Sequence, residues 1–247
     1  MSEKLLNNDR IVKNADVGIV EVTDQVLAEI NKHTLEPLTS DQVFVFKLLI
    51  SDNSKDREDD IFTADTLKGL APLFIGKTMI KDHMGKSDNQ VARIFKTDVI
   101  TSTDRFNEIG EAYTQLHAMV YMLKSVSNEP LIADIKAGIK KEVSLSVGVE
   151  RVECSICGVN KRETYCEHWH GGTYDGKKCM FLYKDAKQAY EVSFVAVPAN
   201  ANAGVMKSLI TEKPELETVQ KDSTLDLELD IMAEFISLEK SKIQEDI

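Results

Sequence analysis

The chain has 247 residues, of which 43% are hydrophobic and 29% are charged, as expected for one domain of ordinary size with appendages or for two small domains. A net charge of −11 argues against nucleic acid as the main partner. No apolar run reaches the roughly eighteen residues that a membrane-spanning helix needs, and the first residues do not resemble a signal peptide. We therefore expect a cytosolic protein that has no membrane partner.

In the N-terminal segment, residues 1–40, the sequence pattern predicts only a short strand and a short helix. Residues 17–22 are expected to form a strand, and residues 23–32 a helix that Thr23 caps. The next strand is expected over residues 42–50, where apolar side chains occupy both alternating sets. Such a strand is expected to be buried on both faces of the sheet.

A helix is expected after the charged loop of residues 51–60. Thr63 is suited to cap this helix, which runs to about Phe74, and Gly76 is suited to end it. The chain then predicts a short strand, a loop rich in Gly, Ser, Asp and Asn that carries His83, and a second strand. A histidine at a strand end is well placed for chemistry, because the strand fixes its position while the loop exposes it.

The middle of the chain predicts a strand over residues 111–123 and a helix over residues 129–140 that Asn128 caps. This helix leads into residues 141–149, a predicted strand with two unlike faces. The residues that alternate along it are Val143, Leu145, Val147 and Val149 on one face and Ser144, Ser146 and Gly148 on the other. A row of small polar residues on an otherwise apolar strand can present a hydroxyl group to a groove.

A last strand is expected over residues 189–198, and Pro198 stops it. Glu191, Ser193 and Val195 share one face of this strand. Serine on a strand is usually only a polar face. The upstream His83 and the downstream Glu191 are what favour a catalytic role for the serine strand.

The four cysteines form a cluster in the sequence. They are Cys154, Cys157, Cys166 and Cys179, and His168 and His170 lie among them. A Cys-x-x-Cys pair lets two thiolates reach one tetrahedral ion, and a second close pair can supply the other ligands. We therefore predict a structural zinc site with Cys154, Cys157, Cys166 and His168 as ligands. Cys179 and His170 remain alternatives for the fourth position.

The C-terminal residues 211–247 differ from the rest of the chain, because they hold eleven Asp or Glu residues against four Lys. They predict an acidic linker followed by an amphipathic helix. The apolar seam of that helix is Leu225, Leu229, Met232, Ile236 and Ile243. We expect this seam to pack either on its own domain or on a partner or second subunit, and we expect self-association.

Three segments resemble the tailed-phage prohead (capsid maturation) protease family, whose fold is related to the herpesvirus assemblin proteases. In residues 76–94, His83 follows a short apolar strand and a second strand begins soon after. In residues 145–148, an apolar-Ser-apolar-Gly sequence is similar to the nucleophile strand of the family. Residues 191–200 are similar to the Glu-apolar-Ser-apolar-apolar strand that ends in Pro-Ala-Asn.

The resemblance implies Ser146 as nucleophile, His83 as general base and Glu191 as the third member of a triad. Because Ser144 shares the face of Ser146, periodicity does not choose between them, and the choice of Ser146 depends on the Ser-Val-Gly match. Asp185 competes with Glu191 for the third position. So does His117, since herpesvirus proteases use a second histidine.

The resemblance also implies an α+β fold over residues 41–210, with a mostly β, barrel-like protease core and flanking helices. Residues 152–182 would be a small zinc-knuckle insertion in this core. Two departures from the family are Val149, where the family often has an aromatic residue, and Ala201, where it often has proline.

The expected function is a serine endopeptidase in the host cytoplasm, inside the assembling prohead. Its substrates would be scaffold and capsid proteins. The alternative is a catalytically inactive, zinc-containing prohead core or scaffold protein that binds capsid subunits. A general zinc-stabilised adaptor is a third and weaker interpretation.

Overall fold

The structure is a computed structural model, and it describes residues 18–206. The predictions for residues 211–247 therefore lie outside the described residues. The helices and strands, in chain order, are α1 (Asp24–Asn31), β1 (Val43–Asp52), β2 (Asp60–Phe62), α2 (Ala64–Phe74), β3 (Thr78–Lys81), the 3-10 helix η1 (Ser87–Asn89), β4 (Ala92–Phe106), β5 (Ala112–Leu123), α3 (Glu129–Lys136), β6 (Val143–Cys154), β7 (Thr173–Tyr174), β8 (Lys177–Lys178), β9 (Phe181–Phe194) and β10 (Gly204–Val205).

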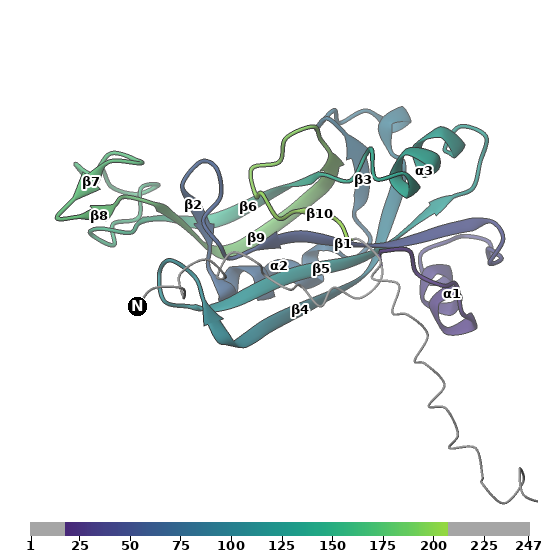
Figure 1. Cartoon of the computed structure of the whole chain (residues 1–247), viewed down its shortest axis with the longest axis horizontal. Helices are drawn as coiled ribbons and strands as arrows, with labels where there is room; N and C mark the ends of the chain where they lie inside the picture. Colours follow the sequence, from purple (N-terminus) through teal and green to yellow (C-terminus); the bar gives the residue numbers. More distant parts are fainter. Residues whose placement is uncertain (1–17, 207–247) are drawn as a thin grey trace, which may run out of the picture. The chain divides into compact units, whose positions relative to one another are not determined.

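Eight of these strands form one mixed sheet. Its order is β10-β1-β5-β4-β3-β9-β2, and β6 pairs with β9 away from this path. Strand β9 is central, because it pairs antiparallel with β6 along most of its length and parallel with β2 and β3 at its two ends. Strands β7 and β8 form a separate hairpin beyond the far end of the β6–β9 ladder (Figure 1).

The expected α+β class is confirmed, with a large mixed sheet and few helices, but the sheet is not a closed barrel. A single bridge between Glu142 and Gly204 brings the start of β6 to β10. Among the described residues no ladder continues this bridge along β6. The expectation of a barrel-like core is therefore wrong in this respect, because closure needs a continuous row of paired strands.

The core lies between the sheet and the helices α2 and α3. Alternate residues of β1, among them Phe46 and Leu48, are fully buried in it with Leu67 of α2. The opposite face of β1 packs with Ile30 of α1 in a second apolar cluster that includes Val45. The prediction that this strand is buried on both faces is thus confirmed.

Most predicted element positions agree with the structure. Thr23 and Thr63 cap α1 and α2, since each side chain accepts a hydrogen bond from a backbone N–H three residues later. Gly76 follows α2 with a φ of 80°, a left-handed conformation that favours glycine. The strand expected over residues 17–22 is reduced, in the described residues, to one bridge between Ile19 and Phe46.

The helix expected over residues 129–140 is shorter than predicted. It ends at Lys136 because Gly138 adopts a left-handed φ of 72°, and the N–H of Ile139 turns back to the carbonyl of Asp134 at 2.9 Å. Asn128 makes no side-chain capping bond, and its amide instead donates to the carbonyl of Leu123. Asn128 is therefore the N-cap residue, as predicted, but its side chain does not cap the helix.

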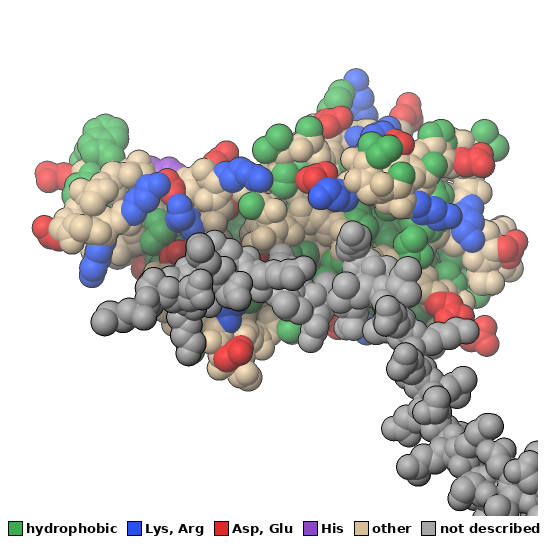
Figure 2. Space-filling view, viewed as in Figure 1, with side chains coloured by type: hydrophobic (Ala, Val, Ile, Leu, Met, Phe, Trp, Pro, Cys, Tyr) green, Lys and Arg blue, Asp and Glu red, His purple; other side chains and the backbone are tan. Residues whose placement is uncertain are grey.

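In the part of the chain described here, no helix is long and apolar enough to cross a membrane. Figure 2 shows acidic and basic side chains interspersed on the coloured part of the visible face.

Candidate functional site

His83 and Glu191 contact each other directly. Nδ1 of His83 lies 2.7 Å from Oε1 of Glu191. The side chain of Glu191 is 12% exposed, whereas that of His83 is 43% exposed. The carboxylate is therefore shielded from water on most sides, while the imidazole stays open to a ligand.

A tight turn after β3 places His83 at this position. Strand β3 pairs in parallel with the last residues of β9. The next two residues, Asp82 and His83, both adopt a left-handed backbone, with φ of 56° and 53°. Asn89 holds the following loop, because its side-chain amide donates to the carbonyls of Lys81 at 2.7 Å and Met84 at 2.9 Å. The turn therefore directs His83 back toward the end of β9.

Strand β6 brings Ser146 to the same face of the sheet. Ser146 is directly opposite Glu191 in the antiparallel β6–β9 ladder, and Ser144 is opposite Ser193. Residues directly opposite each other in such a ladder project on the same face. Within residues 18–206, however, no hydrogen bond joins Ser146 to His83. The structure thus brings His83 and Glu191 into contact and places Ser146 beside this pair.

The two other candidates for the third position have different partners. Asp185 forms an ion pair with Nε of Arg151. His117 is buried on β5, where Nε2 lies 3.3 Å from the side-chain oxygen of Gln115 and Nδ1 faces the sulfur of Met206 at 3.2 Å. The carboxylate that contacts the ring of His83 is that of Glu191.

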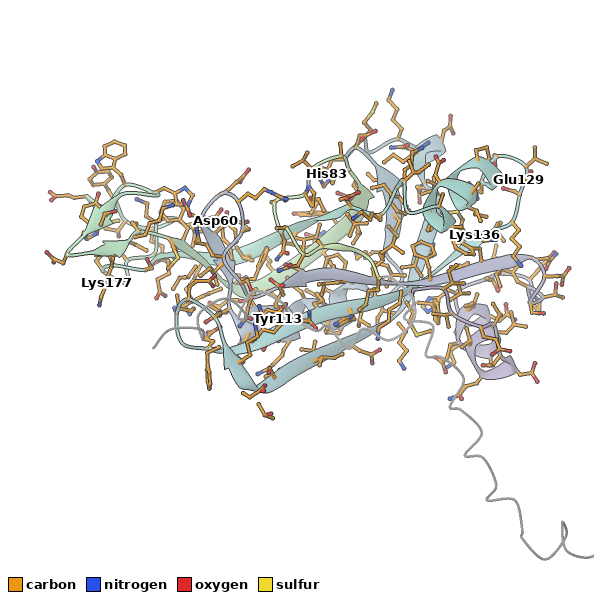
Figure 3. The ribbon with its side chains drawn as sticks, viewed as in Figure 1. Asp60, His83, Tyr113, Glu129, Lys136 and Lys177 are labelled. Carbon is orange, nitrogen blue, oxygen red and sulfur yellow. The ribbon has the colours of Figure 1, made fainter. Side chains whose placement is uncertain are left out.

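A groove with a volume of about 360 Å³ lies beside β6. Ser146 lines it together with the carboxylates of Asp52 and Asp60. Asp60 lies beside the first residues of β9, whereas His83 lies near the last ones (Figure 3). Ser146 therefore lines the groove and also lies on the face of the sheet where Glu191 contacts His83. A ligand bound in the groove would therefore lie beside Ser146.

Hydrogen bonds hold the two buried carboxylates of this groove. Asp52 accepts a bond from the hydroxyl of Tyr113, and Asp60 accepts one from the hydroxyl of Tyr183, both at 2.6 Å. Burial raises the pKa of both tyrosines and of Asp60. Nε2 of His170 lies 2.9 Å from the second oxygen of Asp60. No local pattern indicated this network, since its members come from segments far apart in the sequence.

The predicted metal ligands lie together in the structure. Cys154, Cys157, Cys166 and His168 each offer one ligand atom, and these atoms all lie within 4.8 Å of one another. Nδ1 of His168 is buried and has no hydrogen-bond partner within the described residues. A buried ring nitrogen without a hydrogen-bond partner, on a histidine that lies beside three thiols, is typical of a metal site. The cluster could therefore hold a metal ion.

The surroundings favour the metal-binding thiolate form at Cys154 and Cys166 but not at Cys157. A backbone N–H at Val159 favours the Cys157 thiolate, but burial and the neighbouring thiols of Cys154 and Cys166 outweigh it and raise the pKa of Cys157. Burial opposes the ionisation of Cys154, but backbone N–H groups of Cys157 and Ile156 outweigh it and lower the pKa to about 7. Burial also opposes the ionisation of Cys166, yet its pKa is lowered by neighbouring donors that include Lys161. The ammonium of Lys161 lies 3.4 Å from the sulfur of Cys166.

The structure separates the three candidates for the fourth ligand. His170 faces Asp60 and stacks on Phe181, with ring centroids 4.1 Å apart, so it is turned away from the cluster. Cys179 is fully buried, and its sulfur lies 3.7 Å from that of Cys154. Burial raises the pKa of Cys179 to about 11. His168 completes the cluster, and Cys179 is a fifth donor at its edge.

The cysteine segment is tied to the loop that borders the groove. Lys178 pairs with Asp59 at 2.7 Å, in addition to the contact between His170 and Asp60. Asp59 also pairs with Lys55 at 2.6 Å. These ion pairs connect the segment to residues 55–60.

Sequence reasoning assigned no role to Ser193. Its hydroxyl donates to Oε2 of Glu191 at 2.7 Å and accepts the backbone N–H of His83 at 3.0 Å. The signal in the sequence is the alternation itself, because a residue two positions from Glu191 on a strand projects on the same face.

Comparisons with known proteins assign this chain to no family. No protein-family model, no curated protein and no solved structure matches it.

Proposed function

We propose that this chain is a serine endopeptidase that processes scaffold and capsid proteins during phage prohead maturation. Ser146 is the nucleophile, His83 the general base and Glu191 the group that orients the base. The contact of 2.7 Å between His83 and Glu191 is the observation that carries the proposal. The resemblance of the three segments to the prohead protease family supplies the reaction and the substrates.

The chemistry follows from what a hydroxyl needs. A serine hydroxyl is a weak nucleophile until an imidazole takes its proton, and a carboxylate then fixes the tautomer and stabilises the charge of the ring. With Glu191 at Nδ1, the other ring nitrogen of His83 is left to accept the proton of Ser146. The ring would have to approach Ser146 when substrate binds, and catalytic hydrogen bonds often tighten only in that complex.

A fluorophosphonate probe tests this proposal, because it reacts with activated serine hydroxyls. Mass spectrometry of the labelled protein should locate the probe on Ser146. Ser146→Ala and His83→Ala should lose the label, while Ser144→Ala should keep it. Co-expression with the scaffold and capsid proteins should yield shortened products only when Ser146 is present.

The proposal fails if Ser146 stays unlabelled and the capsid and scaffold proteins stay intact. That outcome would favour the second candidate, an inactive prohead core protein that binds capsid subunits. One observation favours it: within the described residues, Ser146 and His83 share no hydrogen bond. Binding of capsid subunits without cleavage would then be the property to measure.

We also propose that the metal is zinc and that its role is structural. Three cysteines and one histidine are a common zinc ligand set, and four protein ligands leave no open position for chemistry. A tetrahedral site with Zn–S bonds of about 2.3 Å has edges of roughly 3.8 Å, so binding zinc would draw the four ligand atoms, which lie within 4.8 Å of one another, slightly closer together. The insertion would then be a zinc knuckle on a herpesvirus-protease-like core.

A further inference from the structure

The backbone at His83 needs support from outside its own loop. Asp82 and His83 are consecutive non-glycine residues with positive φ, a conformation that side chains disfavour. Two hydrogen bonds from β9 hold them there. The N–H of Asp82 donates to the carbonyl of Phe194 at 3.0 Å, and the N–H of His83 donates to the hydroxyl of Ser193 at 3.0 Å. Ser193 therefore fixes the position of the His83 backbone.

The same hydroxyl fixes the carboxylate. Ser193 is fully buried and donates its only proton to Oε2 of Glu191 at 2.7 Å. The other carboxylate oxygen, Oε1, then faces Nδ1 of His83 at 2.7 Å. The three residues form a closed ring of bonds, from the His83 backbone through Ser193 and Glu191 to the His83 imidazole.

We infer that Ser193 is a positioning residue that holds Glu191 and His83 in the arrangement a general base requires. The catalytic part of this inference rests on the proposed function. Because the hydroxyl proton of Ser193 is committed to Oε2, Oε1 stays available as an acceptor. A neutral His83 then carries its proton on Nδ1 and leaves Nε2 as the proton acceptor.

The tautomer of His83 can be measured without any assay of activity. Long-range ¹H–¹⁵N correlation spectra of the full-length, histidine-labelled protein distinguish protonation at Nδ1 from protonation at Nε2. In the wild-type protein we expect the Nδ1-protonated form to dominate. In Ser193→Ala we expect a mixture with the Nε2-protonated form, together with a roughly tenfold or larger fall in kcat and little change in KM.

Two variants serve as controls. Thr97→Val also removes one hydroxyl, which donates to the carbonyl of Ala71 at 2.8 Å on another part of the sheet, and it should change neither the tautomer nor kcat. Ser193→Cys nearly keeps the volume with a weaker donor, so it should give an intermediate result if Ser193→Ala fails to fold.

An unchanged His83 tautomer in folded Ser193→Ala or Ser193→Cys would overturn the inference. If the tautomer of His83 changes in Ser193→Ala but the wild-type protein cleaves no substrate, the positioning role of Ser193 is upheld and the proposed function is rejected. The two ideas therefore fail separately.

Discussion

Ser146 on β6 and Glu191 on β9 are opposite each other in the antiparallel ladder, so their side chains leave the sheet on one face. His83 reaches Glu191 from β3, on the other side of β9. The imidazole must therefore extend over Glu191 to approach Ser146. This relationship makes Glu191 the residue on which the geometry of the site depends.

Replacing Glu191 with glutamine should lower kcat for peptide cleavage by roughly 10²- to 10⁴-fold, because an amide no longer selects the required histidine tautomer. The matched control is Asp185→Asn, which removes the same charge from a carboxylate that pairs with Arg151. Steady-state kinetics on a peptide from a mapped cleavage site would measure both. Equal losses in the two variants would contradict the role given to Glu191.

The cysteine cluster should bind one equivalent of zinc, and native mass spectrometry should detect it. Removing the metal by chelation, or replacing Cys154 with serine, should lower Tm by on the order of 10 °C, because a structural metal contributes to folding. A metal-free protein with an unchanged Tm would rule out the structural role.

The same site makes a prediction about its fourth ligand. Cobalt-substituted protein should show the absorption of three thiolates and one nitrogen donor, and His168→Asn should alter that spectrum. Cys179→Ser should leave the spectrum nearly unchanged, because Cys179 lies at the edge of the cluster. The reverse pattern would assign Cys179 to the fourth position.

The ion pairs of Asp59 should stabilise the protein at neutral pH and lose this effect in acid. Its ion pairs with Lys178 and Lys55 lower its pKa from 3.8 to about 2. A carboxylate whose pKa is lower in the folded state contributes stability that is present above about pH 4 and lost as the pH falls toward 2. Asp59→Asn keeps a residue that tolerates the left-handed φ of 65°.

We therefore expect Asp59→Asn to reduce the free energy of unfolding at pH 7 by roughly 0.5–1 kcal/mol, since these ion pairs are partly exposed. Urea titrations at pH 7, 4 and 2 should show the difference from wild type shrinking as the pH falls. A difference that stays constant across this range would mean that the ion pairs are not its cause.

Removing the cap of α2 should destabilise the core. The hydroxyl of Thr63 accepts the N–H of Thr66 and lies 2.8 Å from the hydroxyl of Thr66, and both residues are buried. Thr63→Ala should cost about 1 kcal/mol in urea unfolding. Thr23→Ala at the more exposed start of α1 should reduce the free energy of unfolding by a smaller amount. A larger reduction for Thr23→Ala than for Thr63→Ala would contradict the prediction that the cap of α2 matters more to stability.

The sequence by itself determined the features that depend on neighbouring residues. Thr63 begins α2 and Gly76 follows it because capping and left-handed turns are local properties of the chain. The alternation of Val143 and Ser144 likewise follows from the two-residue period of a strand. The spacing of Cys154 and Cys157 allowed two thiols to meet because only two residues separate them. Gly138 is also a local stop signal, and it ends α3 earlier than the predicted residue 140.

Only the tertiary structure decided which distant groups meet. His83 and Glu191 are 108 residues apart, and their contact requires both the pairing of β3 with β9 and two left-handed residues after β3. The same holds for His170, which faces Asp60 of β2 rather than joining the cysteines beside it in the sequence. The sheet also stays open beyond a single bridge at Glu142. Such contacts depend on strand pairing and packing summed over the whole fold, and no pattern along a single segment encodes them.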